Sequence, residues 1–475
     1  MPVTDRRFVL AALSASLFPV ALRPAAAAAL ARQGAVRLGP AHPFSFEMLS
    51  ARAQQNAGGA YTPPVPPDPG LVAKIDFDTV QKIKFRPDHA LWRGRAGQDP
   101  VAFFPLNRYS GEPVVLHAVE DGTARQILYG ADYFDHQGSG LTTKALAGLG
   151  FAGFRVMDSQ QAATDWLAFQ GASYFRSIAI DTGGPEAEEF PRFSEFWLAP
   201  HAGGITIFAL LDGPSLTGAY RFEAVKKDTV TIDVEARLFL RKDIARLGIA
   251  PLTSMYWYGE NQRDKAADWR PEIHDNDGLA LWTGAGERIW RPLINPPVVQ
   301  TNSFQDSDPK GFGLMQRDRD FDHYQDDGAF YNKRPGIWIE PKGSWGKGAV
   351  ELVEIPTEDE IHDNIVAYWR PAEAAKAGGA MRFSYRLYWQ DRLPDYPDGI
   401  AKVVATRLGR GGIPGANPWP RDTTKFVVDF TGGPLAAMAQ RYDVAPVVSA
   451  SRGTVSGAYV ITVVGTDRWR ALFDL

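Results

Sequence analysis

The stretch Thr229–Leu240, TVTIDVEARLFL, alternates apolar and polar residues along its length. A period of two places every second side chain on the same face of a β-strand. Met381–Trp389 (MRFSYRLYW) and Lys425–Phe430 (KFVVDF) have the same pattern. The 46 Gly and 35 Pro residues punctuate the chain throughout, as turns do between antiparallel strands. We therefore predict an all-β fold of antiparallel sandwiches.

Two segments break the strand pattern. Phe44–Ala57 (FSFEMLSARAQQNA) has helical spacing and ends at Gly58-Gly59, a plausible C-cap. The Pro-rich YTPPVPPDPG that follows predicts an extended connection. From Gln390 to Arg421 turn residues crowd together and apolar residues are few, so we expect a domain junction there.

The N-terminus has the features of an export signal. Arg6 and Arg7 precede an apolar, Ala-rich stretch that ends near Ala31 in small residues. This pattern predicts a twin-arginine signal peptide over residues 1–31 and a periplasmic location. A short membrane anchor is the alternative, but the apolar run from Phe8 to about Leu22 is short for a span. We expect no later segment to span a membrane.

The composition of the 475-residue chain excludes several classes of function. A net charge of −4 provides no basic field for nucleic acid. Cys is absent, which rules out disulfides, thiolate zinc sites and a Cys nucleophile. The eight His residues are scattered, and we find no phosphate loop, GxSxG or HExxH motif. We therefore expect no metal and no cofactor.

The tripeptide His-Asp-Asn occurs twice. His274–Asn276 lies within PEIHDNDG, and His362–Asn364 lies within EDEIHDNIVAYW. The block Met255–Trp389, which contains both, holds eight of the 13 Trp residues. Flat aromatic faces suit sugar rings, and a pair of carboxyls can break a glycosidic bond. We therefore predict a carbohydrate cleft with Asp275 and Asp363 as its catalytic pair.

Each of these residues also has a structural interpretation. A single Trp, such as Trp290 or Trp338, can belong to a sandwich core, and DNDG around Asp275 is good turn chemistry. Asp363 is harder to explain as a turn residue, because four acids fall within EDEIHD just before the strand-like run IVAYW. Crowded carboxylates raise one another's pKa, which lets an acid keep its proton near neutral pH.

Several longer strings are specific enough to compare with known families. They are YGENQRDKAADWRPEIHDNDGLALWTGAGERIWRPLINP, GFGLMQRDRDFDHYQD, PKGSWGKGAVELVEIPTEDEIHDNIVAYWRP, GASYFR, EEFPRFSEFW and FVVDFTG. From about Phe44 to the end, the chain resembles the periplasmic glucan biosynthesis proteins G and D. The resemblance implies a galactose-mutarotase-like β-sandwich at residues 40–390, a linker at 391–422 and a small immunoglobulin-like domain at 423–475.

The resemblance also implies a function and a mechanism. The family shapes the β-1,2-linked backbone of osmoregulated periplasmic glucans, and the twin-arginine signal leans toward the D type, a glycoside hydrolase or transglycosylase. The family's catalytic acid falls on Asp363, which neighbours such as Glu360 would keep protonated, and its partner carboxylate falls on Asp275. If Asp275 activates water the reaction inverts, whereas direct attack from about 5 to 5.5 Å retains configuration, and both stay open.

Further residues and partners complete these expectations. His274 and His362 are expected to support the pair, and Trp269, Arg270, Tyr331 and Arg334 to contact sugar. The expected ligand is β-1,2-glucan, and a membrane glucan glucosyltransferase is a candidate partner. One alternative is a non-catalytic glucan-binding protein that guides backbone synthesis or branching. Another, mutarotase-like chemistry, rests on fold analogy alone.

The chain departs from the family pattern in two places. After GASYFR the family continues with a Gly-rich stretch containing a YGLSARG-like motif, whereas here Arg176 is followed by Ser177 and then IAIDT. Roughly a dozen residues are missing there, which is expected to alter the glucan groove. The chain also stops at Leu475 within a strand-like run, so we expect an incomplete C-terminal sandwich with an open edge.

Overall fold

The strand predicted over residues 229–240 lies in the middle of a large sheet. It is β13 (Val230–Leu240), which pairs antiparallel with β12 (Leu216–Lys226) and with β25 (Ala380–Gln390). The computed structural model describes residues 36–161, 164–171, 177–178, 189–392, 399–413, 415 and 420–475. The expected signal peptide, residues 172–176 of GASYFR and part of the expected linker lie outside the described residues.

The alternating pattern of β13 determines which of its faces is buried. Ile232, Val234, Ala236, Leu238 and Leu240 are each at most 4% exposed and belong to the main hydrophobic core. The other two predicted strands are also present, as β25 and as β27 (Thr424–Thr431). The all-β fold class is therefore confirmed, because apolar residues at every second position fill one face of each sheet.

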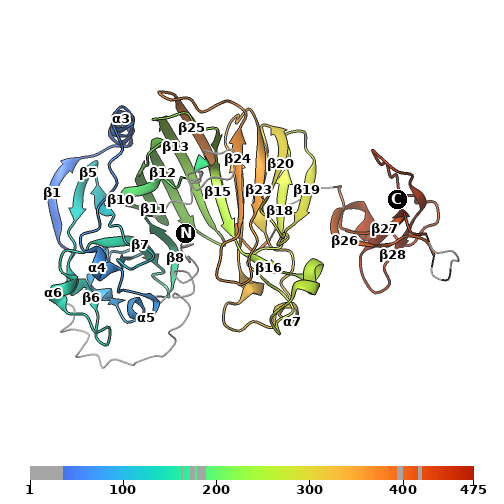
Figure 1. Cartoon of the computed structure of the whole chain (residues 1–475), viewed down its shortest axis with the longest axis horizontal. Coiled ribbons are helices and arrows are strands. Elements are labelled where there is room, and N and C mark those ends of the chain that lie inside the picture. The colour runs from blue at the N-terminus through green and yellow to red at the C-terminus, as the bar shows by residue number, and fades with distance from the viewer. Residues whose placement is uncertain are drawn as a thin grey trace. The chain divides into compact units, whose positions relative to one another are not determined.

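Among the described residues, twelve strands form the large sheet (Figure 1). Neighbouring strands are antiparallel except for the parallel pair of β4 with β10. In spatial order the strands are β1 (Leu38–Pro43), β5 (Thr123–Ile127), β4 (Val115–Glu120), β10 (Arg192–His201), β11 (Gly204–Asp212), β12, β13, β25, β22 (Gly336–Pro341), β21 (Gly311–Met315), β18 (Gly278–Trp282) and β19 (Arg288–Pro292).

Two smaller sheets share the core of the large one. The first has the order β15 (Ile249–Ser254), β24 (Ile365–Pro371), β23 (Lys347–Glu354) and β20 (Gln300–Ser307), and the second has β3 (Val101–Pro105), β7 (Phe151–Met157) and β8 (Asp165–Gln170). Phe154 of β7 meets Phe196 of β10 edge to face at 5.4 Å, and Trp345 meets Phe383 of β25 at 5.6 Å. Aromatic contacts of this kind join the layers into one core.

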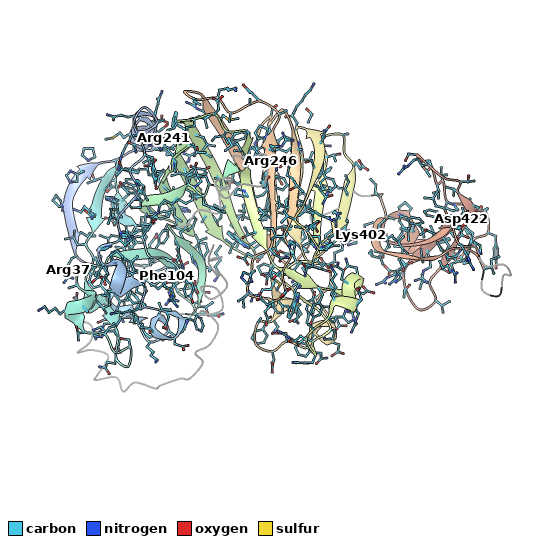
Figure 2. All side chains as sticks on the ribbon, in the orientation of Figure 1. Arg37, Phe104, Arg241, Arg246, Lys402 and Asp422 are labelled. Carbon is cyan, nitrogen blue, oxygen red and sulfur yellow. The ribbon has the colours of Figure 1, made fainter. Side chains whose placement is uncertain are left out.

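Helix α3 (Phe46–Ala57) covers the opposite face of the large sheet (Figure 1). Ser45 caps its first turn by accepting a hydrogen bond from the Met48 N–H at 3.2 Å, and Gly58 is the C-cap. Arg241, marked in Figure 2, donates to the Asn56 carbonyl at 2.8 Å near the end of the helix. The predicted helix is therefore confirmed, starting two residues later because Ser45 acts as the cap.

The C-terminal part of the chain forms a separate compact unit that begins after residue 393. Its sheet has the order β26 (Lys402–Arg410), β27, β29 (Trp469–Asp474) and β28 (Ser456–Thr462). Asp429 of β27 is 1% exposed and accepts hydrogen bonds from Arg407 at 3.0 Å and Arg470 at 2.6 Å. The immunoglobulin-like and mutarotase-like domain types stay predictions.

Short elements connect the sheets. The paired strands are β2 (Lys84–Phe85) with β6 (Phe134–Asp135), β9 (Ser177–Ile178) with β14 (Arg246–Leu247), and β16 (Tyr256–Tyr258) with β17 (Ile273–His274). The helical turns are α4 (Pro69–Val72), α5 (Phe77–Val80), α6 (Thr143–Leu146), α7 (Phe321–Tyr324), η1 (Pro87–His89), η2 (Ala131–Tyr133), η3 (Glu260–Lys265), η4 (Tyr331–Lys333) and η5 (Gly433–Ala437). Across the described part of the chain, no helix is long and apolar enough to cross a bilayer.

Candidate functional site

The two His-Asp-Asn tripeptides meet at one short backbone segment, residues 254–256. His274 ends β17, which pairs with β16, and the Asp275 N–H donates to the Met255 carbonyl at 2.8 Å. The second tripeptide directly precedes β24, whose first residue, Ile365, lies opposite Ser254 of β15. Figure 1 shows β16 and α7 beyond one end of β23 and β24. The two tripeptides, 88 positions apart in sequence, therefore approach the same segment between β15 and β16.

The asparagine of each tripeptide fixes this segment. Asn276 accepts a hydrogen bond from the Ser254 hydroxyl at 2.8 Å. Asn364 accepts from the Tyr256 N–H at 2.8 Å and donates to the Tyr256 carbonyl at 2.9 Å and to the Ile355 carbonyl at 2.8 Å. Both amides are buried, at 5% and 2% exposure. The asparagines therefore fix residues 254–256 against the two segments that carry the adjacent aspartates.

The two histidines have different surroundings. His274 is fully buried, stacks on the Tyr256 ring at 5.3 Å, and its Nε2 lies 2.9 Å from Glu272. His362 is about one-third exposed, and its Nδ1 lies 2.7 Å from Asp359. The sequence predicted a supporting role for both. Only His274 is part of the packed interior, so the two cannot support the site in the same way.

Both aspartates of the tripeptides stay partly exposed, unlike the asparagines beside them. The Asp275 side chain is 26% exposed, and its Oδ1 lies 3.5 Å from Nε of Arg334. Asp363 is partly buried. Arg334 is in turn held by a hydrogen bond from its Nε to the Ala329 carbonyl at 3.1 Å. Arg334, which was predicted as a sugar contact, therefore lies beside the carboxylate of Asp275.

Arg270 is the centre of a carboxylate cluster. Its guanidinium donates two hydrogen bonds to Glu360, at 3.0 and 2.9 Å, and also binds Asp268 and Asp326. Burial opposes the charge, but the hydrogen bonds with Asp268, Glu360 and Asp326 raise the pKa of Arg270 well above its usual value. The hydrogen bond from Arg270 lowers the pKa of Asp268. The cluster therefore holds Glu360 as a charge-compensated carboxylate.

The predicted sugar contacts differ in accessibility. Trp269 is 75% exposed, which leaves its ring open to a ligand. Tyr331 is 3% exposed, and its hydroxyl donates to Glu360 at 2.6 Å. Arg270 is 12% exposed and Arg334 is 30% exposed. Tyr331 and Arg270 therefore both hydrogen-bond to Glu360, whereas Trp269 alone among the predicted contacts is mostly open to solvent.

Two acids of this site were missed from the sequence. Asp326 is 5% exposed and binds Arg270 at 2.5 Å, while its other oxygen accepts N–H groups of the loop before Tyr331. Asp277 accepts the Arg317 and Asp318 N–H groups at 3.0 and 3.1 Å, and burial raises the pKa of Asp277. Asp277 lies in DNDG and Asp326 ends GFGLMQRDRDFDHYQD, both quoted in the sequence analysis, but their partners are distant in sequence.

The residues that the structure describes do not form the ligand sets that metal ions need. No group of three or more His, Cys, Asp or Glu side chains is placed so that it could hold a metal ion. The acids of the site are instead paired with Arg270 and Arg334. The described side chains of this cluster are carboxyls, arginines and aromatic rings.

The fold and the site define a class: an all-β protein with an arginine-braced carboxylate cluster beside an exposed Trp. The family model of the periplasmic glucan biosynthesis protein MdoG matches residues 44–475. The chain belongs to this periplasmic family, and its relatives' names support a role in periplasmic glucan biosynthesis.

The relatives are similar over nearly the whole chain. Glucans biosynthesis protein D 2 of Ralstonia nicotianae is 47% identical over 503 residues, covering 100% of this chain and 92% of the relative. Glucans biosynthesis protein D of Stenotrophomonas maltophilia is 46% identical, covering 98% and 90%. Glucans biosynthesis protein D of Xanthomonas oryzae pv. oryzae is 45% identical, covering 99% and 92%. The recognition of the G and D family, leaning toward D, is therefore confirmed.

A solved structure adds nothing to this assignment. The Slr1438 protein of Synechocystis sp. PCC 6803 has a TM-score of 0.19 and 8% sequence identity, covering 59% of this chain and 97% of that one. A superposition of this quality carries no information about the fold or the site.

Proposed function

We propose that the protein, exported by the twin-arginine pathway, acts on β-1,2-glucan in the periplasm as an endo-glucanase or a transglycosylase. One observation supports this most. Asp275 and the residue after Asp363 bind the same peptide group, the one that joins Met255 to Tyr256, while both aspartates keep part of their side chains exposed. Two accessible carboxyls whose segments are both held against residues 254–256 suit general acid and base catalysis of glycosidic cleavage.

In this proposal Asp363 donates a proton to the glycosidic oxygen, and Asp275 acts on the anomeric side. Arg334, 3.5 Å from Oδ1 of Asp275, orients that carboxylate. If Asp275 activates a water, the product has inverted configuration, and if it attacks carbon directly, configuration is retained and transfer to another glucan becomes possible. Proton NMR of the first-formed product distinguishes the two.

In this proposal Glu360 has a structural role and contributes little to keeping Asp363 protonated. Its carboxylate is bound by two N–H groups of Arg270 and by the Tyr331 hydroxyl. A carboxylate compensated in this way exerts little repulsion on Asp363, so it contributes less to keeping that acid protonated than an unpaired neighbour would. We propose instead that Glu360 anchors the loop that carries Asp363.

Trp269 provides the sugar-binding surface. Its side chain is 75% exposed and follows directly on Asp268, which is fixed by Arg270. A flat, open indole is suited to stacking against the axial C–H groups of a glucose ring.

The decisive experiment replaces Asp363 with Asn and measures reducing ends released from linear β-1,2-glucan. We expect a loss of about a hundredfold or more, because the proton donor is gone. Glu358→Gln is the matched control, since Glu358 is an exposed acid of the same run, and it should retain wild-type activity. Unchanged turnover in Asp363→Asn would refute the assigned acid.

The alternative is a non-catalytic glucan-binding protein that guides the product of a membrane glucosyltransferase. The exposure of Trp269 supports this alternative as much as it supports an enzyme, because stacking of a sugar on the indole needs no proton transfer. The alternative holds if the wild-type protein retains β-1,2-glucan, loses that binding in Trp269→Ala, and produces neither reducing ends nor cyclic products.

A further inference from the structure

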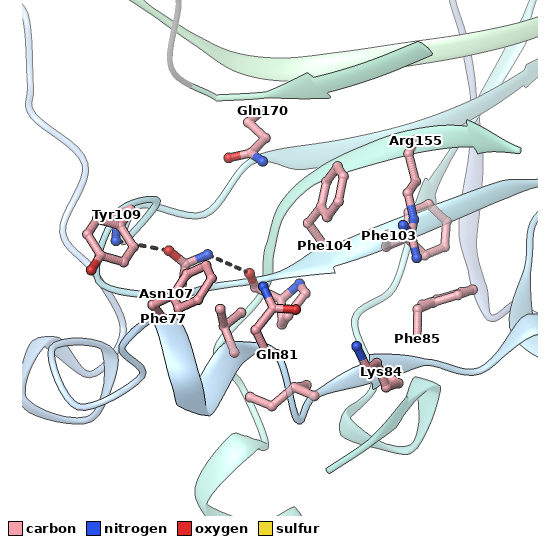
Figure 3. A pocket seen from close by; sticks show the side chains of 13 residues that line it. Phe77, Gln81, Lys84, Phe85, Phe103, Phe104, Asn107, Tyr109, Arg155 and Gln170 are labelled. Atoms are coloured by element: carbon pink, nitrogen blue, oxygen red, sulfur yellow. Dashed lines mark hydrogen bonds between the residues drawn. The ribbon is translucent and has the colours of Figure 1, made fainter. Parts of the chain in front are cut away.

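A separate cavity of about 110 Å³ lies among α5, β2, β3 and β7 in the N-terminal part of the first unit (Figure 3). None of the residues discussed for the glucan site lines it. Its walls include five aromatic side chains, those of Phe77, Phe85, Phe103, Phe104 and Tyr109. Pockets for drug-sized ligands are several times this size, so the cavity suits a small molecule with a single ring.

The charge of the cavity has one sign. Its lining includes the cationic side chains of Lys84 and Arg155, and none of the described residues that line it is Asp or Glu. Figure 3 shows Arg155 on β7 and Lys84 on β2 on opposite sides of the space. An aromatic cavity with two cations and no carboxylate favours a ligand that carries negative charge.

Arg155 is held in a setting that leaves part of its hydrogen-bonding capacity unused. Its guanidinium carbon lies 5.5 Å from the centre of the Phe104 ring, which is marked in Figure 2. Its Nε is buried and has no hydrogen-bond partner in the described part of the molecule. Burial lowers the pKa of Arg155, although the charge of Asp165 opposes this. A buried N–H without an acceptor is costly, so Arg155 is an incompletely hydrogen-bonded cation beside the cavity.

The neutral polar side chains fit the same ligand. Gln170 accepts a hydrogen bond from the Ser110 hydroxyl at 2.6 Å, which leaves its amide N–H groups to donate. Asn107 accepts from the Tyr109 and Ser110 N–H groups at 2.9 and 3.1 Å, so its carbonyl shapes the turn. The groups left to contact a ligand are therefore largely donors.

We propose that this cavity binds a small molecule in which a carboxylate or phosphate group is joined to a single ring. The ring lies between the aromatic walls, and the anionic group accepts hydrogen bonds from Arg155 and Gln170, with Lys84 at the exposed side. Nothing in this assignment depends on cleavage of glucan.

Binding of four probes to the full mature protein tests the proposal by calorimetry. Phenyl phosphate and benzoate are expected to bind, while phenol, which lacks the charge, and inorganic phosphate, which lacks the ring, bind about tenfold or more weakly. The difference between phenyl phosphate and benzoate identifies the preferred anion. If neither ring anion binds at millimolar concentration, or if inorganic phosphate binds as well as phenyl phosphate, the proposal is wrong.

Variants locate the binding. Arg155→Met should weaken phenyl phosphate about tenfold or more, and Lys84→Met, an exposed residue, should weaken it several-fold without affecting folding. Arg93→Met, an exposed arginine outside the cavity, is the control and should bind normally. Asp363→Asn should also bind normally, which separates this cavity from the glucan site. Full affinity in Lys84→Met together with full affinity or misfolding in Arg155→Met would overturn the assignment.

Discussion

The two His-Asp-Asn tripeptides have identical sequences but different structural environments. Their asparagines do the same work, since both hold residues 254–256, but Asn364 makes three hydrogen bonds to main-chain groups and Asn276 makes one short bond to Ser254 and a longer one, 3.4 Å, to the Pro335 carbonyl. Their histidines differ completely, one buried and one partly exposed. A repeated motif can therefore mark one shared structural task without marking equivalent residues.

The strongest way to separate the two copies is to compare their aspartates chemically. Asp275→Asn and Asp363→Asn should each reduce cleavage of β-1,2-glucan by about a hundredfold to ten-thousandfold. On an aryl β-glucan with a good leaving group, Asp363→Asn should recover much of its rate, because that leaving group needs no proton. Steady-state kinetics with both substrates measures this, and equal losses on both substrates for both variants would contradict the division into acid and base.

The asparagines should differ in their contribution to stability. Asn364→Ala leaves a Tyr256 N–H and two carbonyls without partners and should lower the free energy of unfolding by about 3 kcal/mol. Asn276→Ala should cost about 1.5 kcal/mol, because its bonds are fewer. Urea denaturation of each variant gives the two values. A larger loss for Asn276→Ala would show that the first tripeptide, not the second, anchors the segment.

The arginines that brace the two copies should differ as well. Arg270→Met leaves Asp268, Asp326 and Glu360 without their shared cation and should cost about 2 kcal/mol at neutral pH, whereas Arg334→Met, at 3.5 Å from one carboxylate, should cost about 0.5 kcal/mol or less.

The pH dependence of the Arg270 effect follows from Asp268, whose pKa is lowered in the folded state by Arg270. A carboxyl with a lowered folded pKa stabilises the fold above its unfolded value of about 3.9, and this stabilisation is lost as pH falls through the folded pKa. The gap between wild type and Arg270→Met should therefore shrink below about pH 4. Denaturation curves from pH 7 to pH 3 measure it, and a constant gap would contradict the ion-pair explanation.

The smallest effect is expected at the partly exposed histidine. His362→Ala removes one contact with Asp359 from a side chain that is 34% exposed, so stability should change by less than about 0.5 kcal/mol. Thermal unfolding detects any larger change. A loss above 1 kcal/mol would mean that His362 has the structural importance of the buried His274, and the contrast between the copies would disappear.

Local sequence patterns predicted the strands and the helix, but they did not predict the contacts between side chains of the candidate site. β13, β25, β27 and α3 each lie within two residues of their predicted ends, because alternation and capping are properties of contiguous residues. The two aspartates were predicted because carboxyls crowd near aromatic residues in the sequence, and their catalytic role stays a prediction. The sequence pattern could not show that the buried Tyr331 donates a hydrogen bond to Glu360 or that Asp326 and Glu360 share Arg270.

The amino-acid sequence by itself determined the all-β class and the family, because each depends on residue types at short spacing or on long matching strings. The catalytic role of the two aspartates stays a prediction. The tertiary structure alone decided that residues 275 and 364 bind the same peptide group, between Met255 and Tyr256, and that Arg270 joins three acids from three segments. The physical reason is that such contacts are set by strand register between segments far apart in the chain, which no local periodicity encodes.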